Sequence, residues 1–173
     1  MKTTFRQRTA NTMIIKDKAW LAGFVDGEGY IGINRQRKKT TRENYASFLY
    51  HPYLIISSTD KKIISNIKNI TGCGWAITNK RSEPGYKDSY QYKLTKFNDL
   101  LHILEQLHPL LKIKFKQCDL LIKYINIRIE KCETKISGRG SRGMTNFSEI
   151  EEKIYTKLRI LNKRGKNYGT PLS

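Results

Sequence analysis

The sequence predicts an α+β fold in which an antiparallel sheet is combined with helices, with further helices at the C-terminal end. Two observations predict this class. Apolar residues recur at helical spacing and then in alternation with polar ones, and this change repeats along the chain. The predicted elements follow in the order α-β-β-α-β-β-α-α-α, and consecutive strands joined by turns pair as antiparallel neighbours. We find no repeat of the first half in the second.

A helix and a strand open the predicted core. The helical pattern starts near Lys18 and stops at Gly27 and Gly29, because glycine is a poor helix former. In the segment that follows, Ile31 and Ile33 alternate with small and polar residues. Side chains of a strand alternate between its two faces, so one apolar and one polar face are expected here.

The second strand is expected over residues 45–57 and contains Pro52. Since proline lacks the amide proton that a neighbouring strand would accept, this strand should be at an edge of the sheet or bulged at Pro52. Asp60 or Thr59 can cap the next helix, which ends within residues 71–74. Four apolar residues line one side of this helix: Ile63, Ile64, Ile67 and Ile70.

The second half of the chain contains two more strands and three helices. The strands are expected over residues 75–81 and 86–95, joined by a turn at Pro84 and Gly85. The helices are predicted to run from Asn98 to the break at Pro109, from about 114 to 131, and from about 148 to 161.

These elements divide the chain into four expected segments. Residues 137–144 are rich in glycine and arginine and predict a flexible connection. The segments are a basic N-terminal arm (1–17), a core domain (18–132), a flexible basic linker (133–147) and a C-terminal helix with a basic tail (148–173).

The charge of the chain points to a polyanionic partner. Lysine and arginine outnumber aspartate and glutamate 33 to 15, which gives a formal net charge of +18. Such an excess repels itself in a compact fold and favours nucleic acid as the partner. The apolar runs are too short for a helix that spans a membrane, so no membrane partner is expected. The three cysteines match no zinc or redox spacing.

The segment Leu21–Gly29, with the sequence LAGFVDGEG, carries the chemistry. Its end brings the carboxylates of Asp26 and Glu28 close together, and carboxylate oxygens are hard ligands that suit Mg²⁺. Its small residues would let a second helix approach closely: Ala22, Gly23 and Gly27. The segment closely resembles the LAGLIDADG motif, with seven of nine positions identical or chemically close and Gly27 and Glu28 the looser ones.

The resemblance to the single-motif LAGLIDADG homing endonucleases implies an αββαββα fold with a curved, four-stranded antiparallel sheet that binds DNA. It also implies that two motif helices pack at the centre of a dimer, through Leu21, Ala22, Gly23, Val25 and Asp26. Each helix would contribute Glu28 and the backbone oxygen of Gly27 to a site for Mg²⁺, which Mn²⁺ could replace. One motif per chain and two strands to cut predict a homodimer, and a symmetric protein favours a roughly palindromic target.

Two further segments resemble the family. In residues 111–117, LKIKFKQ, the second lysine of the L-K-x-K core maps to the active-site lysine, which is Lys114 here. A cation at this position can organise water or stabilise charge on a phosphate; Lys112 and Lys116 are the alternatives. Residues 56–60 resemble the end of the family's second strand, where Gln or Asn lies near the active-site water. This chain has Ser58 there, or Ser57 if the strand shifts by one, and a hydroxyl reaches less far.

The polar face of the predicted sheet is the expected DNA-reading surface, because an antiparallel ribbon fits the major groove. Alternation assigns these residues to it: Asn34, Gln36, Lys38, Asn79, Arg81, Gln91 and Lys93. Asn and Gln suit adenine, whereas Arg and Lys suit guanine or phosphate. Contacts with phosphate are expected from Arg35, Arg37 and Arg42.

The sequence therefore predicts a homing endonuclease: a homodimer that makes a metal-dependent double-strand break with short 3′ overhangs in a long DNA target and so promotes intron mobility. Two alternatives remain open, an intron RNA maturase and a DNA-binding regulator that does not cleave. Glu28 and Lys114 argue against a role in RNA binding alone, which would not require them. An intracellular protein is expected, in an organelle or in a prokaryotic or archaeal cytoplasm.

Overall fold

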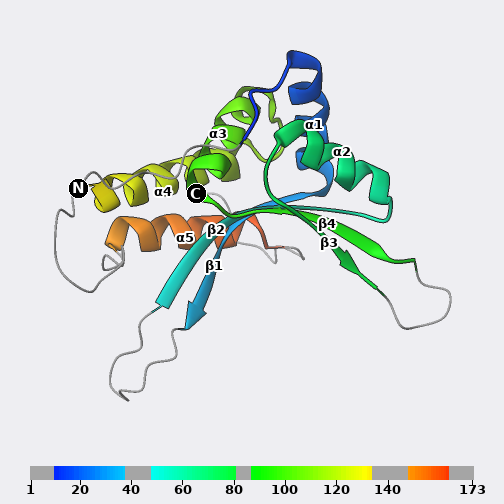
Figure 1. The fold of residues 1–173 in the computed structure, drawn as a ribbon. Coiled ribbons are helices and arrows are strands. Elements are labelled where there is room, and N and C mark those ends of the chain that lie inside the picture. Colours follow the sequence, from blue (N-terminus) through cyan, green and yellow to red (C-terminus); the bar gives the residue numbers. More distant parts are fainter. Residues whose placement is uncertain (1–9, 38–47, 81–86, 134–147, 164–173) are drawn as a thin grey trace, which may run out of the picture.

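The computed structural model describes residues 10–37, 48–80, 87–133 and 148–163 (Figure 1). The elements of this part of the chain are, in order, α1 (Ile15–Glu28), β1 (Gly29–Arg37), β2 (Phe48–Ser58), α2 (Lys61–Thr71), β3 (Trp75–Asn79), β4 (Ser89–Leu94), α3 (Phe97–Leu107), the 3-10 turn η1 (His108–Leu110), α4 (Phe115–Glu133) and α5 (Glu149–Leu161). The mixed α+β class and the element order are as predicted. The expected turn at Pro84 and Gly85 and the linker over residues 137–144 lie outside the described residues.

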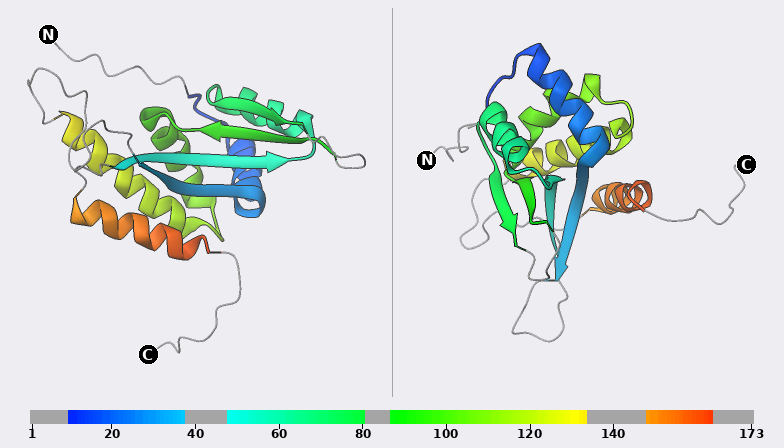
Figure 2. Two further views of the ribbon diagram at one scale, coloured as in Figure 1. Left: turned by 90° about the horizontal axis from the view of Figure 1, so that it is seen from below. Right: turned by 90° about the vertical axis from the view of Figure 1, so that its right-hand side faces the viewer.

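The four strands form one antiparallel sheet in the order β1-β2-β4-β3. Helices α1 to α4 lie on one side of the sheet, and the view from below shows its other face crossed by no helix (Figure 2). Helix α5 lies alongside β1, the strand at one edge. There the side-chain amide of Asn162 donates to the carbonyl oxygen of Ile31 over 2.8 Å, which satisfies an acceptor that an edge strand leaves unpaired.

The core lies between the sheet and the helices that cover it. Leu54, Ile56 and Leu94 are at most 1% exposed, and Leu100 and Leu104 of α3 are fully buried above them. The buried residues of β2 and β4 occur at every second position, as the alternation in the sequence predicts. The period-two pattern therefore separates a packed face from an open face.

Pro52 is accommodated by a local edge within a central strand. It pairs with Ile33 of β1 in a continuous register, so no bulge is needed. Strand β4, however, pairs with β2 only from Leu54 to Ser58. At Pro52 the strand thus has a described neighbour on one side only, which tolerates a residue without an amide proton. The strand as a whole is central, whereas the position of the proline is an edge.

The ends of two helices can be compared with the sequence signals. The side chain of Asp60 accepts the amide of Lys62 over 2.8 Å and caps α2, and Gly72 ends this helix with a φ of 66°. Helix α3, by contrast, begins at Phe97 and not after a cap at Asn98. Its first turn is closed by an ion pair of 2.9 Å between Lys96 and the buried Asp99, so charge and not a side-chain cap determines the start.

Residues 10–14 are docked on the helices, which differs from the arm expected over residues 1–17. The amide of Asn11 donates to the carbonyl of Thr71 over 2.8 Å, and Gln106 bridges Met13 and Asn11. Met13 is 5% exposed. Helix α1 then starts at Ile15, three residues earlier than the periodicity predicts.

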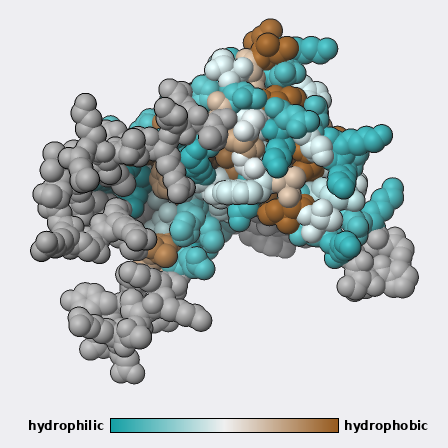
Figure 3. All heavy atoms as spheres, in the orientation of Figure 1, coloured by the Kyte–Doolittle hydropathy of each residue, from teal (hydrophilic) through white to brown (hydrophobic). Residues whose placement is uncertain are grey.

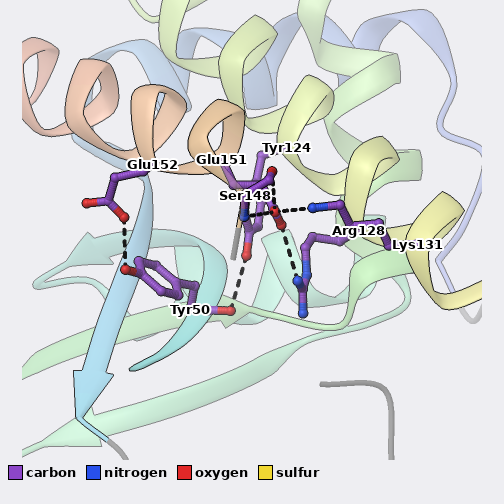
Figure 4. Close-up of polar contacts among 7 residues, drawn as sticks. All are labelled: Tyr50, Tyr124, Arg128, Lys131, Ser148, Glu151 and Glu152. Atoms are coloured by element: carbon purple, nitrogen blue, oxygen red, sulfur yellow. Dashed lines mark hydrogen bonds and ion pairs between the residues drawn. The ribbon is translucent and has the colours of Figure 1, made fainter. Parts of the chain in front are cut away.

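Helix α5 is part of the same core and is held to α4 by a buried acid. Glu151 is fully buried and accepts hydrogen bonds from Lys131, Arg128 and Ser148 (Figure 4). The apolar residues Ile154, Tyr155 and Leu158 add their side chains to the main hydrophobic cluster. Helix α5, which follows the expected linker, is therefore packed against the core domain. In the described segments, every helix is too short or too polar to cross a membrane.

Candidate active site and DNA-facing sheet

The C-terminal end of α1 is joined to the segment that precedes α4. One carboxylate oxygen of Asp26 accepts the amide of Lys112 over 2.7 Å, and the other accepts the amide of Lys114 over 2.9 Å. In return, the ammonium group of Lys114 donates to the backbone oxygen of Asp26. These bonds connect residues that are 86 and 88 positions apart and bring Lys114 to the end of the motif helix.

The electrostatics of Asp26 follow from these contacts. Partial burial raises the pKa of this carboxyl group, but the amides of Lys112, Lys114 and Ile113 and the charge of Lys114 lower it more. The pKa of Asp26 consequently lies below its usual value of 3.8. Because both oxygens are occupied by amides of the same chain, Asp26 is a structural anchor and is poorly placed to bind a metal ion.

Glu28, two residues further on, has the opposite environment. It is the last residue of α1, its side chain is exposed, and it makes no hydrogen bond or ion pair with any other residue that the structure describes. Gly27 is exposed beside it. The described residues contain no group of three or more His, Cys, Asp or Glu side chains that could hold a metal ion. A single chain thus offers one free carboxylate at this place, next to the lysine bound to Asp26.

Ser58 lies at the end of β2, where its hydroxyl group has a structural contact. Its oxygen accepts the amide of Asp60 over 3.0 Å, in the turn that leads into α2. Ser58 pairs with Tyr90 at the end of the β2–β4 ladder, and Ser57 pairs with Gln91 beside it. The hydroxyl is half-buried and contributes to the start of α2.

The motif helix turns a different side outward from the one that we expected for dimer contacts. Leu21, Ala22 and Val25 are at most 2% exposed and belong to the core of this chain, which leaves them no surface for a partner. Gly23 and Gly27 are exposed, and a Cβ atom added to either would meet no atom within 4 Å. Of the expected interface residues, Gly23 alone faces outward fully, since Asp26 is tied to the α4 segment.

The outward side of α1 continues toward its N-terminal end. Ala19 and Ile15, four and eight residues before Gly23, are also exposed, Ile15 to 71%. A space-filling view shows apolar atoms at the top of the molecule, where Figure 1 places the start of α1 (Figure 3). Residues spaced by four share a face of a helix, so Ile15, Ala19, Gly23 and Gly27 form an exposed row of small and apolar residues along α1.

The open face of the sheet collects most of the residues expected to contact DNA. Cross-strand partners lie on the same face, and the register therefore assigns Asn34, Gln36, Asn79, Gln91 and Lys93 to it. A hollow of about 430 Å³ on this face is lined by Asn34, Gln36, His51, Tyr53, Ile55, Lys93 and Thr95. Lys38, Arg42 and Arg81 lie outside the described residues, as does the side chain of Arg37.

Arg35, from which we expected a contact with phosphate, lies on the face of β1 opposite to the open face. Its guanidinium group lies 3.8 Å from the ring centroid of Phe48 and forms an ion pair of 3.6 Å with Glu152 of α5. Alternation explains this: residues 34 and 36 face outward, so residue 35 faces α5. Arg35 thus joins β1 to α5.

Three residues of the open face, Tyr30, Trp75 and Ile77, were not among the residues expected to bind DNA. Trp75 and Ile77 of β3 are 55% and 39% exposed, and Tyr30 and Tyr53 stack with ring centroids 5.6 Å apart. The sequence indicated this position, because residues 75, 77 and 79 alternate with 76 and 78 in one strand and therefore share a face with Asn79. The register places these side chains on the open face.

Fold and site together define a protein with a sheet face that no described helix covers, a contact between Asp26 and Lys114 at the end of one helix, and a net charge of +18, features that suit an enzyme acting on nucleic acid. The model of the LAGLIDADG endonuclease family matches residues 21–125, more than half of the chain. The protein therefore belongs to the LAGLIDADG endonuclease family, and its enzymatic class is DNA endonuclease. No curated protein matches the sequence.

Solved structures show the same fold. The homing endonuclease I-CvuI in complex with the I-CreI target is similar over 89% of this chain and 86% of its own, with 23% identity and a TM-score of 0.60. The archaeal intron-encoded homing endonuclease I-Vdi141I, complexed with DNA, is similar over 90% and 89%, with 17% identity and a TM-score of 0.65. The I-SmaMI LAGLIDADG homing endonuclease bound to cleaved DNA is similar over 87% of this chain but 44% of its own, with 19% identity and a TM-score of 0.55.

Proposed function

We propose that the protein is a site-specific homing endonuclease that works as a homodimer, makes a metal-dependent double-strand break with short 3′ overhangs in a long, roughly palindromic DNA target, and promotes intron mobility inside the cell that carries it. The observation that carries the proposal is the end of α1, where the carboxylate of Glu28 has no partner among the described residues and Lys114 is held two residues away, at the backbone oxygen of Asp26.

Dimerisation is supported by the two sides of α1. One side is buried in the core through Leu21, Ala22 and Val25. The other side is small and apolar and exposed, with open space at Gly23 and Gly27. Small residues allow two helix backbones to approach closely, so an exposed row of them favours a second helix at this place. A second copy of α1 fits this face and would bring the two Glu28 side chains near one axis.

The donor set at the end of α1 fits a small divalent cation. The carboxylate of Glu28 and the backbone oxygen of Gly27 are hard oxygen ligands, which suit Mg²⁺, and Mn²⁺ accepts the same donors. Magnesium keeps several water molecules and is held by few protein groups, so one free acid per chain is sufficient. When bound, such an ion lowers the pKa of its water and offsets negative charge on a phosphate.

The residues of the chain have separate roles in this proposal. Glu28 and Gly27 hold the ion, and Asp26 positions them by tying the end of α1 to the amides of Lys112 and Lys114. The ammonium group of Lys114 stays beside this end, where it can stabilise charge that develops on the phosphate or orient a water molecule. The hydroxyl oxygen of Ser58 accepts the amide of Asp60, and its hydrogen can help to orient a water molecule.

The open face of the sheet supports sequence-specific binding. Amides at Asn34, Gln36 and Gln91 suit adenine, and Lys93 suits guanine or phosphate. A net charge of +18 adds attraction to the phosphates that does not depend on sequence. Two sheets related by a two-fold axis would read an approximate inverted repeat.

The direct test is cleavage by subunits that differ in one acid. Heterodimers of wild type and Glu28→Gln, purified through two different affinity tags, are incubated with Mg²⁺ and a supercoiled plasmid library that carries random inserts, and cut plasmids are sequenced. Wild-type dimers should linearise the recovered target, heterodimers should nick it, and Glu28→Gln dimers should bind without cutting. Linear product from heterodimers at the wild-type rate would contradict one metal-binding acid per subunit.

A second variant tests the dimer without disturbing the subunit. Gly23→Leu places a large side chain in open space and replaces a helix-breaking residue, so the isolated fold should not lose stability. If α1 packs against its copy, this variant should become monomeric in light scattering and should lose double-strand cleavage. The matched control is Asn126→Leu at an exposed position of α4, which should remain dimeric.

The same experiments separate the alternatives. A protein that binds and splices intron RNA, and for which Glu28→Gln changes nothing, would be a maturase. A dimer that binds duplex DNA but never nicks it with Mg²⁺ or Mn²⁺ would be a regulator. Either result would overturn the proposal of a homing endonuclease.

A further inference from the structure

The open face of the sheet carries an apolar belt between two polar arms. Strand pairing aligns Tyr30, Ile55, Lys93 and Trp75 in one row across all four strands. Tyr53 and Ile77 lie beside this row on the same face. We call Tyr30, Tyr53, Ile55, Trp75 and Ile77 the apolar belt. Polar residues lie beyond it, with Asn34 and Gln36 toward one hairpin and Asn79 toward the other.

The belt is a surface and not a displaced part of the core. Trp75 is 55% exposed, Ile77 39% and Tyr30 36%. Tyr30 and Tyr53 stack with an interplanar angle of 7°, and Gly32 between them makes this possible, because a Cβ atom there would lie 2.7 Å from the Tyr30 ring. Exposed apolar groups gathered in this way on one face usually mark a binding surface.

The charge of this face limits what can cover the belt. Lys93 stands within the row between Ile55 and Trp75. Burial of a lone ammonium group in a dry protein interface is costly. Duplex DNA offers a phosphate or an acceptor of guanine to the lysine and, in the major groove, one apolar group, the methyl group of thymine.

We infer, on the basis of the proposed function, that the apolar belt reads thymine: Ile77 and Ile55, with the rings beside them, contact thymine methyl groups in the part of the target that the centre of the sheet covers. Cytosine in the same position would present an amino group to an apolar surface that cannot accept its hydrogen bond. The sheet thus reads its target in two modes, by methyl contact at the centre and by hydrogen bonds along the two arms.

The test compares thymine with uracil, which differ by this methyl group alone. The best target recovered from the random library is synthesised with thymine or with deoxyuridine at its conserved T positions, and cleavage in Mg²⁺ and binding by fluorescence anisotropy are measured with the full chain. Each contacted methyl group should contribute about a fourfold preference for thymine. Positions at which uracil weakens binding should lie together in each half-site.

Two variants connect this preference to the belt. Ile77→Ala should reduce the ratio of thymine to uracil affinity toward one at one position, and Ile55→Ala should do so at a neighbouring position. Ile77 contributes no buried side chain to the core, so its variant should keep the melting temperature of the wild type. Asn34→Ala is the matched control on the same face, and it should leave the ratio unchanged whatever it does to the rate.

The outcomes distinguish this inference from the proposed function. Specific cleavage with equal rates on thymine and uracil targets would overturn the thymine reading and leave the endonuclease intact. A change of oligomeric state in Ile77→Ala would also overturn it, because the belt would then be a protein contact. If no duplex is selected or cut, both proposals fall.

Discussion

Two acids at helix ends in this molecule have opposite surroundings, and the contrast identifies the one available for chemistry. Glu151, in the first turn of α5, is fully buried and bound by Lys131, Arg128 and Ser148. Glu28, the last residue of α1, is exposed and has no partner among the described residues. Asp26 stands between these extremes, with both oxygens bound to backbone amides. The fold uses Glu151 and Asp26 to join helices, which leaves Glu28 for a ligand.

The largest effect of a single substitution is expected at Glu28. Replacing Glu28 by Gln should lower the rate of DNA cleavage by on the order of 10³-fold or more, because a bound cation contributes several kcal/mol to the stabilisation of transition-state charge. The melting temperature should not change, since the carboxylate has no partner in the fold. Single-turnover cleavage and calorimetry measure the two quantities. Glu28→Asp, which keeps a carboxylate, should recover part of the rate, and full activity of Glu28→Gln would refute the assignment.

The reverse pattern is expected at Glu151. Glu151→Gln removes the buried carboxylate that Lys131 and Arg128 share, and should destabilise the fold by about 3 kcal/mol. Denaturant unfolding measures this loss. The neighbouring Glu152→Gln is the matched control: Glu152 bonds to Tyr50 over 3.0 Å at a side chain that is 44% exposed, and its loss should cost less than about 1 kcal/mol. Equal losses in the two variants would show that burial of Glu151 does not matter.

Local signals in the sequence were sufficient for much of the fold. The cap at Asp60, the helix end at Gly72 and the alternation in β1 each depend on residues within a few positions, and each is observed. The start of α3 was misplaced because Lys96 and Asp99 close its first turn through an ion pair. Arg35 was misassigned because its partners, Glu152 and Phe48, are brought to it only by the folded chain.

The candidate site was predicted in part for the same physical reason. The motif identifies Glu28 and Lys114, and the fold brings Lys114 to the end of α1. The orientation of α1 could not be read from the sequence, because a helix with apolar residues on all sides does not indicate which side meets its own core. Leu21 and Val25, which we expected at the dimer interface, are buried in the core of the chain. Ile15 and Ala19 are exposed and are available to a partner.

Lys114 should show a smaller loss of activity than Glu28. Lys114→Met removes a cation near the proposed phosphate position and should lower the cleavage rate by about 10²-fold, with little change in the affinity for DNA. Lys112→Met is the matched control, because the Lys112 side chain is exposed and its backbone amide still donates to Asp26. A pH–rate profile in single-turnover conditions separates loss of a catalytic charge from loss of binding. If Lys112→Met has the larger effect, the assignment of Lys114 is wrong.

Asp26 should give a smaller loss of stability than Glu151 and a clear dependence on pH. Asp26→Asn keeps the shape but replaces charge-assisted bonds to two amides, and should cost about 1.5 kcal/mol. Because the pKa of Asp26 is lowered in the folded state, its contribution is fully present above 3.8, the unfolded value, and disappears as the pH falls through the folded value. Wild type and Asp26→Asn should therefore differ in stability at pH 6 and converge in acid, as urea unfolding at several pH values can show. A difference that persists below pH 2 would mean that the charge of Asp26 does not hold α1 to the α4 segment, and the separation of anchor and ligand between Asp26 and Glu28 would then lose its physical basis.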